Sequence, residues 1–469
     1  MRPIQTFSSI YKNEYGDVTT PYSFAEHMLN FLPVELYKNP LLRWCDPCAG
    51  QGTFALLLYE KLFIHLDESF PDPTQRKQHI LEKMITVIEL NGVYEDRLQN
   101  EFFGCPNIFT KTNFLSFQPK EKYNVILGNP PYNSNGGKKV PTNKSVAKKE
   151  DGTTLWIPFV KHAYSLLQDD GHLLMIFPSL WMKPDKAKMY DFMMAKRIER
   201  ISTFTNTETN RIFHGCAQTP TCIYYGRNTN VANDHHMIPF VVNYTEPEKI
   251  YTYHHKIPKP IPLVGCSIAS KLSHYIDKVG SMMDIVRKTN LPSSKIEIYK
   301  EFSSDNSERY QNIKSCLLSK SNEPFLVYDY SDTPLPYYGK SKLVLAHKMY
   351  GFPYYDQSGA YGISTRDNYV ILTSERTHKH THSQMCLLQS FLSTRFALLM
   401  YETTRYRMKF LEKYAFELIP NILRMHEFER YDKIDDCNIA DIFNLSEDER
   451  EYINNFHRKK YGSFIDKMK

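Results

Sequence analysis

The chain has 469 residues, enough for two or three domains with a large hydrophobic core. Hydrophobic residues make up 42% of it, which excludes an intrinsically disordered protein. The formal net charge of +6 is compatible with nucleic-acid binding but does not require it, and nine scattered cysteines do not form the framework of a secreted disulfide-rich domain.

The amino-terminal segment, MRPIQTFSSIYKNEYG, lacks the apolar stretch of a signal peptide. No apolar run in the sequence is long enough to cross a bilayer. We therefore expect an intracellular protein, either cytoplasmic in a microbe or made by a virus inside its host cell.

In the first half of the chain, strand-like runs alternate with helical patterns. Residues 20–32 predict a short amphipathic helix opened by Thr20-Pro21, because proline suits the first helical position. Residues 66–76 predict a polar, proline-containing loop. The other predicted strands are 41–46, 85–90, 108–114, 123–132 (running into a turn) and 171–179, and the helices are 53–66, 92–104 and 156–167. This alternation predicts an α/β fold, a Rossmann-like and mostly parallel sheet with helices on both faces.

After about residue 235 the alternation ends, and short strand-like runs mix with helices. We place a domain boundary within 227–245. The predicted organisation is an α/β domain over 1–235 and a mixed α+β domain over 236–469.

Four side chains that could bind or activate a ligand lie at the ends of predicted strands: Asp46, Glu89, Asn113 and Asn129. In doubly wound sheets, ligands bind beyond the carboxyl ends of the strands. The coincidence predicts a ligand site at this edge of the sheet.

Residues 46–54, DPCAGQGTF, predict a cofactor loop. Gly50 and Gly52 permit a sharp turn close to a ligand, and the helix amides that follow favour an anionic or polar group. A tight turn without a ligand is the alternative. A carboxylate at Glu89 could accept hydrogen bonds from both hydroxyls of a ribose.

Asn129-Pro130-Pro131-Tyr132 is the strongest chemical signal. The exocyclic amine of a purine is a poor nucleophile, because its lone pair is delocalised into the ring. The side-chain oxygen of Asn129 and a backbone carbonyl can accept both N–H bonds, which localises the lone pair toward a methyl sulfonium. The prolines fix φ, and Tyr132 offers a stacking face for a base turned out of the duplex.

Over residues 15–225 the chain resembles the N6-adenine DNA methyltransferases of the gamma arrangement, in which the cofactor motifs precede the catalytic motif and a target-recognition domain follows. The resemblance implies transfer of a methyl group from S-adenosylmethionine to a flipped-out adenine. It assigns catalytic roles to Asn129, Pro130, Pro131 and Tyr132, and to Phe213, whose ring would pack against the base. It assigns cofactor contacts to Thr20, Pro21, Asp46, Pro47, Gly50, Gly52, Phe54, Glu89, Leu90, Asn113 and Phe114.

The resemblance also makes 236–469 a target-recognition domain that binds double-stranded DNA. It implies a monomer without a metal or membrane, and it allows a separate restriction endonuclease as partner. Two residues depart from the family pattern: Asn113 stands where an acid usually accepts the amino group of the cofactor's adenine, and Asn124 stands where Asp is common. Asn113 can still accept through its amide oxygen, and we expect Asn124 to be structural.

The segment 133–152 is rich in lysine, at Lys138, Lys139, Lys144, Lys148 and Lys149. It is either a lid that contacts DNA phosphates or a solvated loop, and the sequence leaves both open. The same choice applies to the basic residues of 390–423, namely Arg405, Arg407, Lys409 and Lys413.

Alternative substrates for the same catalytic motif are an RNA adenine, cytosine N4 and a protein glutamine amide. Glutamine methyltransferases place a small domain before the catalytic one, whereas over two hundred residues follow it here. A catalytically silent DNA-binding module also stays open. Fewer than twenty residues precede Thr20, so we do not expect a fused nuclease there, and Cys45-x-x-Cys48 lacks the second ligand pair of a zinc site.

Overall fold

The computed structural model describes residues 18–102, 105–134, 153–231, 235–242, 249–289, 296–300, 309–319, 323–346, 351–364, 368–375, 378–407 and 411–456. The chain divides into two compact units, Met1–Val241 and Val242–Lys469. The boundary between the units thus falls before the last residue of the strand His235–Val242 (β10), whereas the predicted boundary at residue 235 falls at its first residue.

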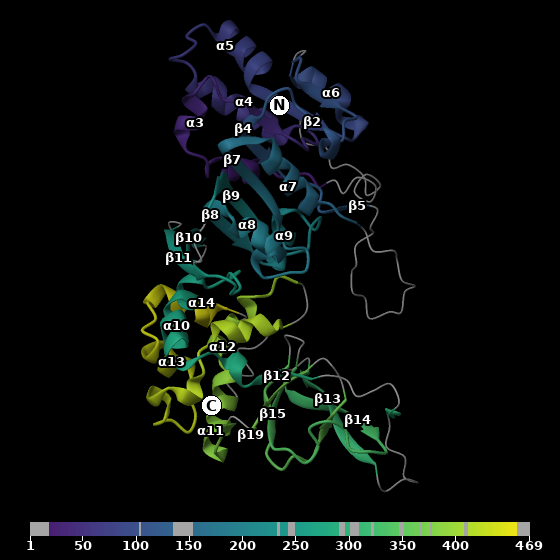
Figure 1. Ribbon diagram of the computed structural model, residues 1–469, viewed down its shortest axis with the longest axis vertical. Helices are drawn as coiled ribbons and strands as arrows, with labels where there is room; N and C mark the ends of the chain where they lie inside the picture. Colours follow the sequence, from purple (N-terminus) through teal and green to yellow (C-terminus); the bar gives the residue numbers. More distant parts are fainter. Residues whose placement is uncertain are drawn as a thin grey trace. The chain divides into compact units, whose positions relative to one another are not determined.

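A nine-stranded sheet organises the first half of the chain, with the order β11-β10-β8-β9-β7-β4-β1-β2-β3 (Figure 1). Five neighbouring strands of this sheet, β3, β2, β1, β4 and β7, are parallel to one another. Strand β9 runs antiparallel between β7 and β8. The strand bounds are Trp44–Asp46 (β1), Ile85–Glu89 (β2), Ile108–Thr110 (β3), Tyr123–Gly128 (β4), Leu167–Pro178 (β7), Lys196–Phe204 (β8), Thr221–Asn230 (β9) and Lys249–Lys256 (β11). The predicted α/β fold with a mostly parallel sheet is confirmed.

Both faces of this sheet are buried, as expected when helices cover each side. Val125 and Leu127 of β4 join one core with helices α2 and α4, while Ile126 between them is equally buried on the opposite face. The helices of this unit are Tyr22–Leu29 (α2), Val34–Lys38 (α3), Thr53–His65 (α4), Pro73–His79 (α5), Glu95–Glu101 (α6), Trp156–Leu166 (α7), Met189–Met194 (α8) and Asn206–Ile212 (α9). Short 3-10 turns lie at Gly92–Tyr94 (η2), Phe114–Ser116 (η3) and Ser179–Met182 (η4), a π turn at Ile80–Met84 (η1), and a two-residue hairpin pairs Asn133–Ser134 (β5) with Thr153–Thr154 (β6).

Several predicted boundaries differ from the structure by a few residues, and capping side chains explain two of the differences. The loop predicted over 66–76 ends earlier, because α5 begins at Pro73 with the Asp72 carboxylate accepting from Gln75 N at 2.8 Å. The strand predicted over 108–114 stops at Thr110, because the side chain of Asn113 caps the η3 turn instead of continuing the strand.

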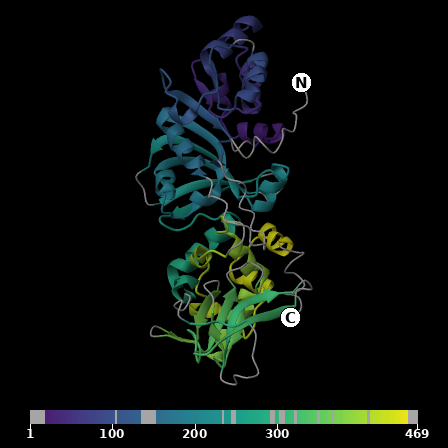
Figure 2. The ribbon, with the colours of Figure 1, turned by 90° about the vertical axis from the view of Figure 1, so that its right-hand side faces the viewer.

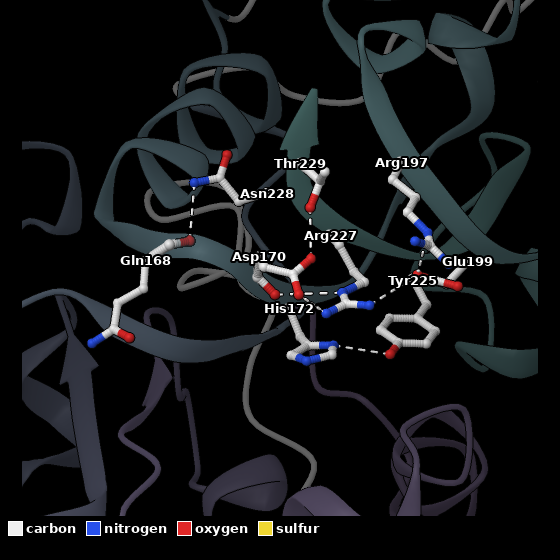
Figure 3. A network of polar contacts seen from close by, with 9 residues as sticks. All are labelled: Gln168, Asp170, His172, Arg197, Glu199, Tyr225, Arg227, Asn228 and Thr229. Atoms are coloured by element: carbon white, nitrogen blue, oxygen red, sulfur yellow. Dashed lines mark hydrogen bonds and ion pairs between the residues drawn. The ribbon is translucent and has the colours of Figure 1, made fainter. Parts of the chain in front are cut away.

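The amino end of β7 carries a network of polar contacts shared with β8 and β9 (Figure 3). The Asp170 carboxylate accepts from the Arg227 guanidinium and from Thr229 Oγ1, the latter at 2.6 Å. His172 Nδ1 and the Tyr225 hydroxyl share a hydrogen bond of 2.9 Å. These contacts tie the strand ends together on the edge of the sheet opposite to the predicted site.

The second unit has strands in the middle of its sequence and helices on either side, which confirms the predicted mixed α+β composition (Figure 2). One sheet has the order β12-β18-β15-β16 and another the order β14-β13-β17. Their bounds are Val286–Lys288 (β12), Tyr310–Leu318 (β13), Pro324–Ser331 (β14), Lys342–Ala346 (β15), Tyr354–Asp356 (β16), Gly362–Ile363 (β17) and Asn368–Leu372 (β18), with a small hairpin of Ser374–Glu375 (β19) and His378–Lys379 (β20). The helices are Cys266–Val279 (α10), His382–Leu392 (α11), Arg395–Glu402 (α12), Asp436–Ile442 (α13) and Glu447–Asn455 (α14), with 3-10 turns at Met282–Asp284 (η5), Lys413–Leu418 (η6), Ile422–Arg424 (η7) and His426–Phe428 (η8). Helices and strands of this unit share one hydrophobic core.

The basic residues noted in 390–423 differ in their surroundings. Arg405 is buried, and its guanidinium donates to the Glu402 carboxylate at 2.6 Å, so it belongs to the interior. Arg407 and Lys413 are exposed, and Lys409 lies outside the described residues. No helix of the described residues is long and apolar enough to span a membrane.

Candidate active site

Asp46, Glu89 and Asn129 stand at the carboxyl ends of three neighbouring parallel strands. Asp46 ends β1, Glu89 ends β2, and Asn129 follows the last residue of β4. Because β1 lies between β2 and β4, the chain leaves β1 in one direction and returns on the other side, which makes this the topological switch point of the sheet.

The loop after β1 turns on two glycines in the left-handed region, Gly50 at φ 53° and Gly52 at φ 87°. A Cβ atom at Gly52 would lie 3.0 Å from Leu98 Cδ2, so both conformation and space favour glycine. The Gly50 amide donates to Glu89 Oε2 at 2.6 Å, and the Asn91 amide donates to Glu89 Oε1 at the same distance. The Glu89 carboxylate therefore holds the loop in place.

Asp46 is fully buried at the base of this loop. Its Oδ1 accepts from the Cys48 amide at 3.3 Å, while Oδ2 has no hydrogen-bond partner among the residues that the structure describes. Burial is the main cause that raises the pKa of Asp46 to about 8, and the nearby charge of Glu89 adds to it. A cationic ligand group would compensate this carboxylate.

The side chain of Asn129 is held on one side only. Its Nδ2 donates to Thr20 Oγ1 at 3.1 Å and to the Val18 carbonyl at 3.4 Å. Its Oδ1 is buried and, within the described part of the chain, accepts no hydrogen bond. The backbone carbonyl of Asn129 accepts a hydrogen bond from the Cys48 thiol at 3.2 Å, which links the Asn-Pro-Pro-Tyr turn to the loop after β1.

Tyr132 follows the two prolines and presents a second unsatisfied group. Its hydroxyl is buried without a hydrogen-bond partner in the described residues, and burial raises its pKa well above the ordinary value. Its backbone carbonyl accepts from the Leu155 amide at 3.0 Å, so the turn is anchored to the segment before α7.

The remaining predicted cofactor residues lie around this edge in different states of exposure. Thr20 is buried and Pro21 caps α2, while Leu90 is 49% exposed directly after Glu89. Asn113 is exposed, but its Oδ1 accepts from the Leu115 amide at 3.0 Å, so it already acts as a cap. Pro47 lies in the loop next to Asp46, Phe54 is buried in α4, and the Phe114 ring packs 5.2 Å from that of Phe159.

Phe213 is almost fully buried at the end of α9, with its ring 5.9 Å from that of Phe24 in an edge-to-face contact. Its contact with a flipped base stays a prediction. The predicted DNA-contacting lysines 138, 139, 144, 148 and 149 lie outside the described residues. No group of three His, Cys, Asp or Glu side chains suited to a metal occurs among the residues described.

Sequence reasoning missed three contributors to this edge. Val18 acts through its carbonyl, which leaves no signal in the side-chain pattern. Cys48 was considered only as half of a C-x-x-C pair, although its thiol reaches the Asn129 carbonyl. Asn91 is buried and its amide binds Glu89; its place two residues after the acid was the available signal.

Comparison with known proteins finds a family that matches part of the chain, including some residues of this site. A family model described as Eco57I restriction-modification methylase matches residues 51–213, which include Glu89 and Asn129. This stretch of the chain is therefore similar to the Eco57I restriction-modification methylase family.

The chain is also similar to two curated proteins. The type II methyltransferase M.VspI of Vibrio sp. (strain 343) is 30% identical over 139 residues, which cover 29% of this chain and 29% of that protein. An uncharacterized adenine-specific methylase of Mycoplasma pneumoniae is 30% identical over 92 residues, covering 19% of this chain and 22% of that protein. The matches thus span less than a third of either relative. Among solved structures, the type IIG restriction endonuclease BpuSI superposes with a TM-score of 0.41 at 11% identity, covering 96% of this chain and 67% of that one.

Proposed function

We propose that the protein is an S-adenosylmethionine-dependent DNA methyltransferase that modifies the N6 amine of adenine. The observation that carries the proposal is the buried Oδ1 of Asn129, an acceptor without a partner in the described residues, directly after β4 in the Asn-Pro-Pro-Tyr turn. A buried acceptor left unpaired costs about 1–3 kcal/mol, so its retention favours a ligand donor at this position.

The cofactor edge fits S-adenosylmethionine in three respects. Asp46 is a buried carboxylate with an unpaired oxygen, which suits a cationic group. Glu89 is a carboxylate at the end of β2, beside the glycine loop, and its oxygens are of the kind that accept from ribose hydroxyls. Leu90, half exposed next to it, offers an apolar surface for a planar ring. We assign cofactor contacts as well to the other predicted residues, Pro21, Pro47, Gly50, Gly52, Phe54, Asn113 and Phe114.

When bound, S-adenosylmethionine supplies an electrophilic methyl group on a sulfonium. The residues of the turn prepare the amine that attacks it. Oδ1 of Asn129 would accept one N–H of the amine, and we assign the other to the Pro130 carbonyl, since the Asn129 carbonyl already binds Cys48. The nitrogen lone pair then forms the new N–C bond as the C–S bond breaks, and the extra N6 proton leaves to water. Positioning and hydrogen bonding are the main catalytic contributions.

Adenine and DNA are supported by the relatives rather than by the site alone. One of the two similar proteins is named a type II methyltransferase, and the other is named an adenine-specific methylase. We propose that unit Val242–Lys469 is the target-recognition domain for double-stranded DNA, because it has its own core and follows the methylase domain. The same turn could hold an RNA adenine, and the test below separates the two by its substrates.

The test compares two asparagines of the same strand region. Asn129→Ala should lower tritiated methyl transfer to mixed genomic DNA by about 100- to 1000-fold, the effect of removing one preorganised hydrogen-bonding group. Asn124→Ala is the matched control: Asn124 sits near the start of β4 and binds the Arg43 amide at 2.8 Å and Gln168 at 2.9 Å. It should reduce stability but keep the methylation rate.

Methylation at the wild-type rate by Asn129→Ala would exclude the proposed mechanism. Product digestion and chromatography would identify the base, and N6-methyladenine is expected. Transfer to RNA but not to DNA would replace the substrate while keeping the reaction.

A further inference from the structure

The amide of Asn129 has a defined orientation. Nδ2 faces two oxygens of the segment before α2, the hydroxyl of Thr20 at 3.1 Å and the carbonyl of Val18 at 3.4 Å. A carbonyl oxygen is an acceptor only, so the Val18 oxygen requires the donor end of the amide. The acceptor end, Oδ1, is left on the unpaired side.

The reverse orientation would be unproductive for chemistry. It would bring Oδ1 of Asn129 against the Val18 carbonyl oxygen, where two acceptors repel. It would also direct Nδ2, a donor, at the incoming amine, whose N–H bonds are donors as well. An Asn side chain that rotates by half a turn would therefore repel the substrate it has to hold.

We propose that Thr20 is a positioning residue for Asn129, and that its hydroxyl, together with the Val18 carbonyl, selects the amide orientation that accepts the substrate amine. The inference rests on the proposed function and deepens it. It differs from the resemblance-based role of Thr20 as a cofactor contact, because the hydroxyl acts on the catalytic amide.

Burial strengthens this selection. Thr20 is 5% exposed, so water does not readily replace its hydroxyl as the acceptor for Nδ2. The backbone of Asn129 is held separately, because the Cys48 thiol donates to the Asn129 carbonyl at 3.2 Å. Of the two acceptors of Asn129 Nδ2, the Val18 carbonyl belongs to the backbone, so the Thr20 hydroxyl is the one that a substitution can remove.

The experiment measures two quantities on the full chain: the single-turnover rate of tritiated methyl transfer to genomic DNA at saturating S-adenosylmethionine, and the equilibrium affinity for S-adenosylmethionine. Thr20→Val replaces the hydroxyl with a methyl group of similar volume. It should lower the rate by about 10- to 100-fold, because a misplaced catalytic group has effects of this size, while the affinity stays within about twofold. Thr20→Ser keeps the hydroxyl and should retain a rate within about threefold of the wild type.

Thr19→Val is the matched control. Thr19 is the exposed neighbour, and its hydroxyl contacts Gln51 at 3.4 Å instead of Asn129. Its rate and affinity should both stay near the wild-type values. Thermal melting checks that each variant is folded, and Thr20→Ala, which introduces no branched group, replaces Thr20→Val if the latter does not fold.

Three results would overturn the inference. A wild-type rate for Thr20→Val would show that the hydroxyl does not orient Asn129. Weakened cofactor affinity with an unchanged saturated rate would make Thr20 a cofactor contact, and a rate for Thr20→Ser as low as that of Thr20→Val would make its role packing. The proposed function fails separately, if the wild-type protein itself transfers no methyl group to DNA.

Discussion

The amino ends and the carboxyl ends of the parallel strands carry polar residues in opposite states. At the amino end of β7, Asp170 accepts hydrogen bonds from both Arg227 and Thr229 (Figure 3). At the carboxyl ends of β1 and β4, Asp46 and Asn129 each keep a buried oxygen without a partner among the described residues. Strand geometry is common to both ends, so it does not explain the contrast.

The difference between the two ends shows where buried polar groups lower the stability of the free protein. A polar group that only supports the structure finds its partner within the structure, as in the network at the amino end. A buried polar group kept unpaired destabilises the free protein and is retained when a ligand supplies the partner. At the candidate site, the unpaired oxygens of Asp46 and Asn129 are therefore the groups that a ligand would satisfy.

The largest effect within this comparison is expected for Glu89 at the ligand edge. Glu89→Ala removes the proposed acceptor of two ribose hydroxyls, each worth about 1.5–3 kcal/mol when the acceptor is charged, and should weaken S-adenosylmethionine binding by at least about 100-fold. Isothermal titration measures it. The control is Glu95→Ala in α6, which removes a surface ion pair with Lys111. It should change the affinity less than about twofold. Equal affinities for Glu89→Ala and the wild type would mean that the ribose site lies elsewhere.

A second prediction concerns pH. Folding raises the pKa of Asp46 from about 4, its value in an unfolded chain, to about 8. Between these values the folded state keeps a proton that the unfolded state has lost, so the free energy of unfolding should fall as pH rises from about 4 to about 8. Asp46→Asn should flatten this fall, and the variant should be more stable than the wild type at pH 8 while binding S-adenosylmethionine more weakly. Urea denaturation across this interval is the measurement; parallel curves for both proteins would contradict the assignment.

The smallest effect is expected at the structural edge. Arg227→Ala removes a partly exposed guanidinium from Asp170 and Glu199 and should lower the free energy of unfolding by about 1 kcal/mol, with methyl transfer unchanged. Arg197→Ala, which removes the more exposed partner of Glu199, should have a still smaller effect. A large loss of methyl transfer in Arg227→Ala would show that the two ends of the strands are not separate in function.

Much of the α/β organisation could be predicted from residue patterns. The alternation of apolar runs and helical patterns identified the strands that end in Asp46 and Glu89, because local periodicity reports which faces are buried. Boundaries were harder. The start of α5 depended on capping by Asp72. The end of β3 depended on whether the Asn113 side chain accepts from the nearby Leu115 amide, and the local sequence is compatible with either a strand or this turn.

The sequence by itself determined the chemistry of the site: an Asn-Pro-Pro-Tyr turn after an apolar strand, a glycine loop and two carboxylates at strand ends, since residue type sets which groups can donate, accept or carry charge. Only the tertiary structure decided which of these groups have partners. Asn129 lies more than a hundred positions from Val18 and Thr20, and no local pattern shows that these residues take its Nδ2 and leave its Oδ1 unpaired. Hydrogen-bond satisfaction depends on contacts between distant segments, and those exist only once the sheet has brought the segments together.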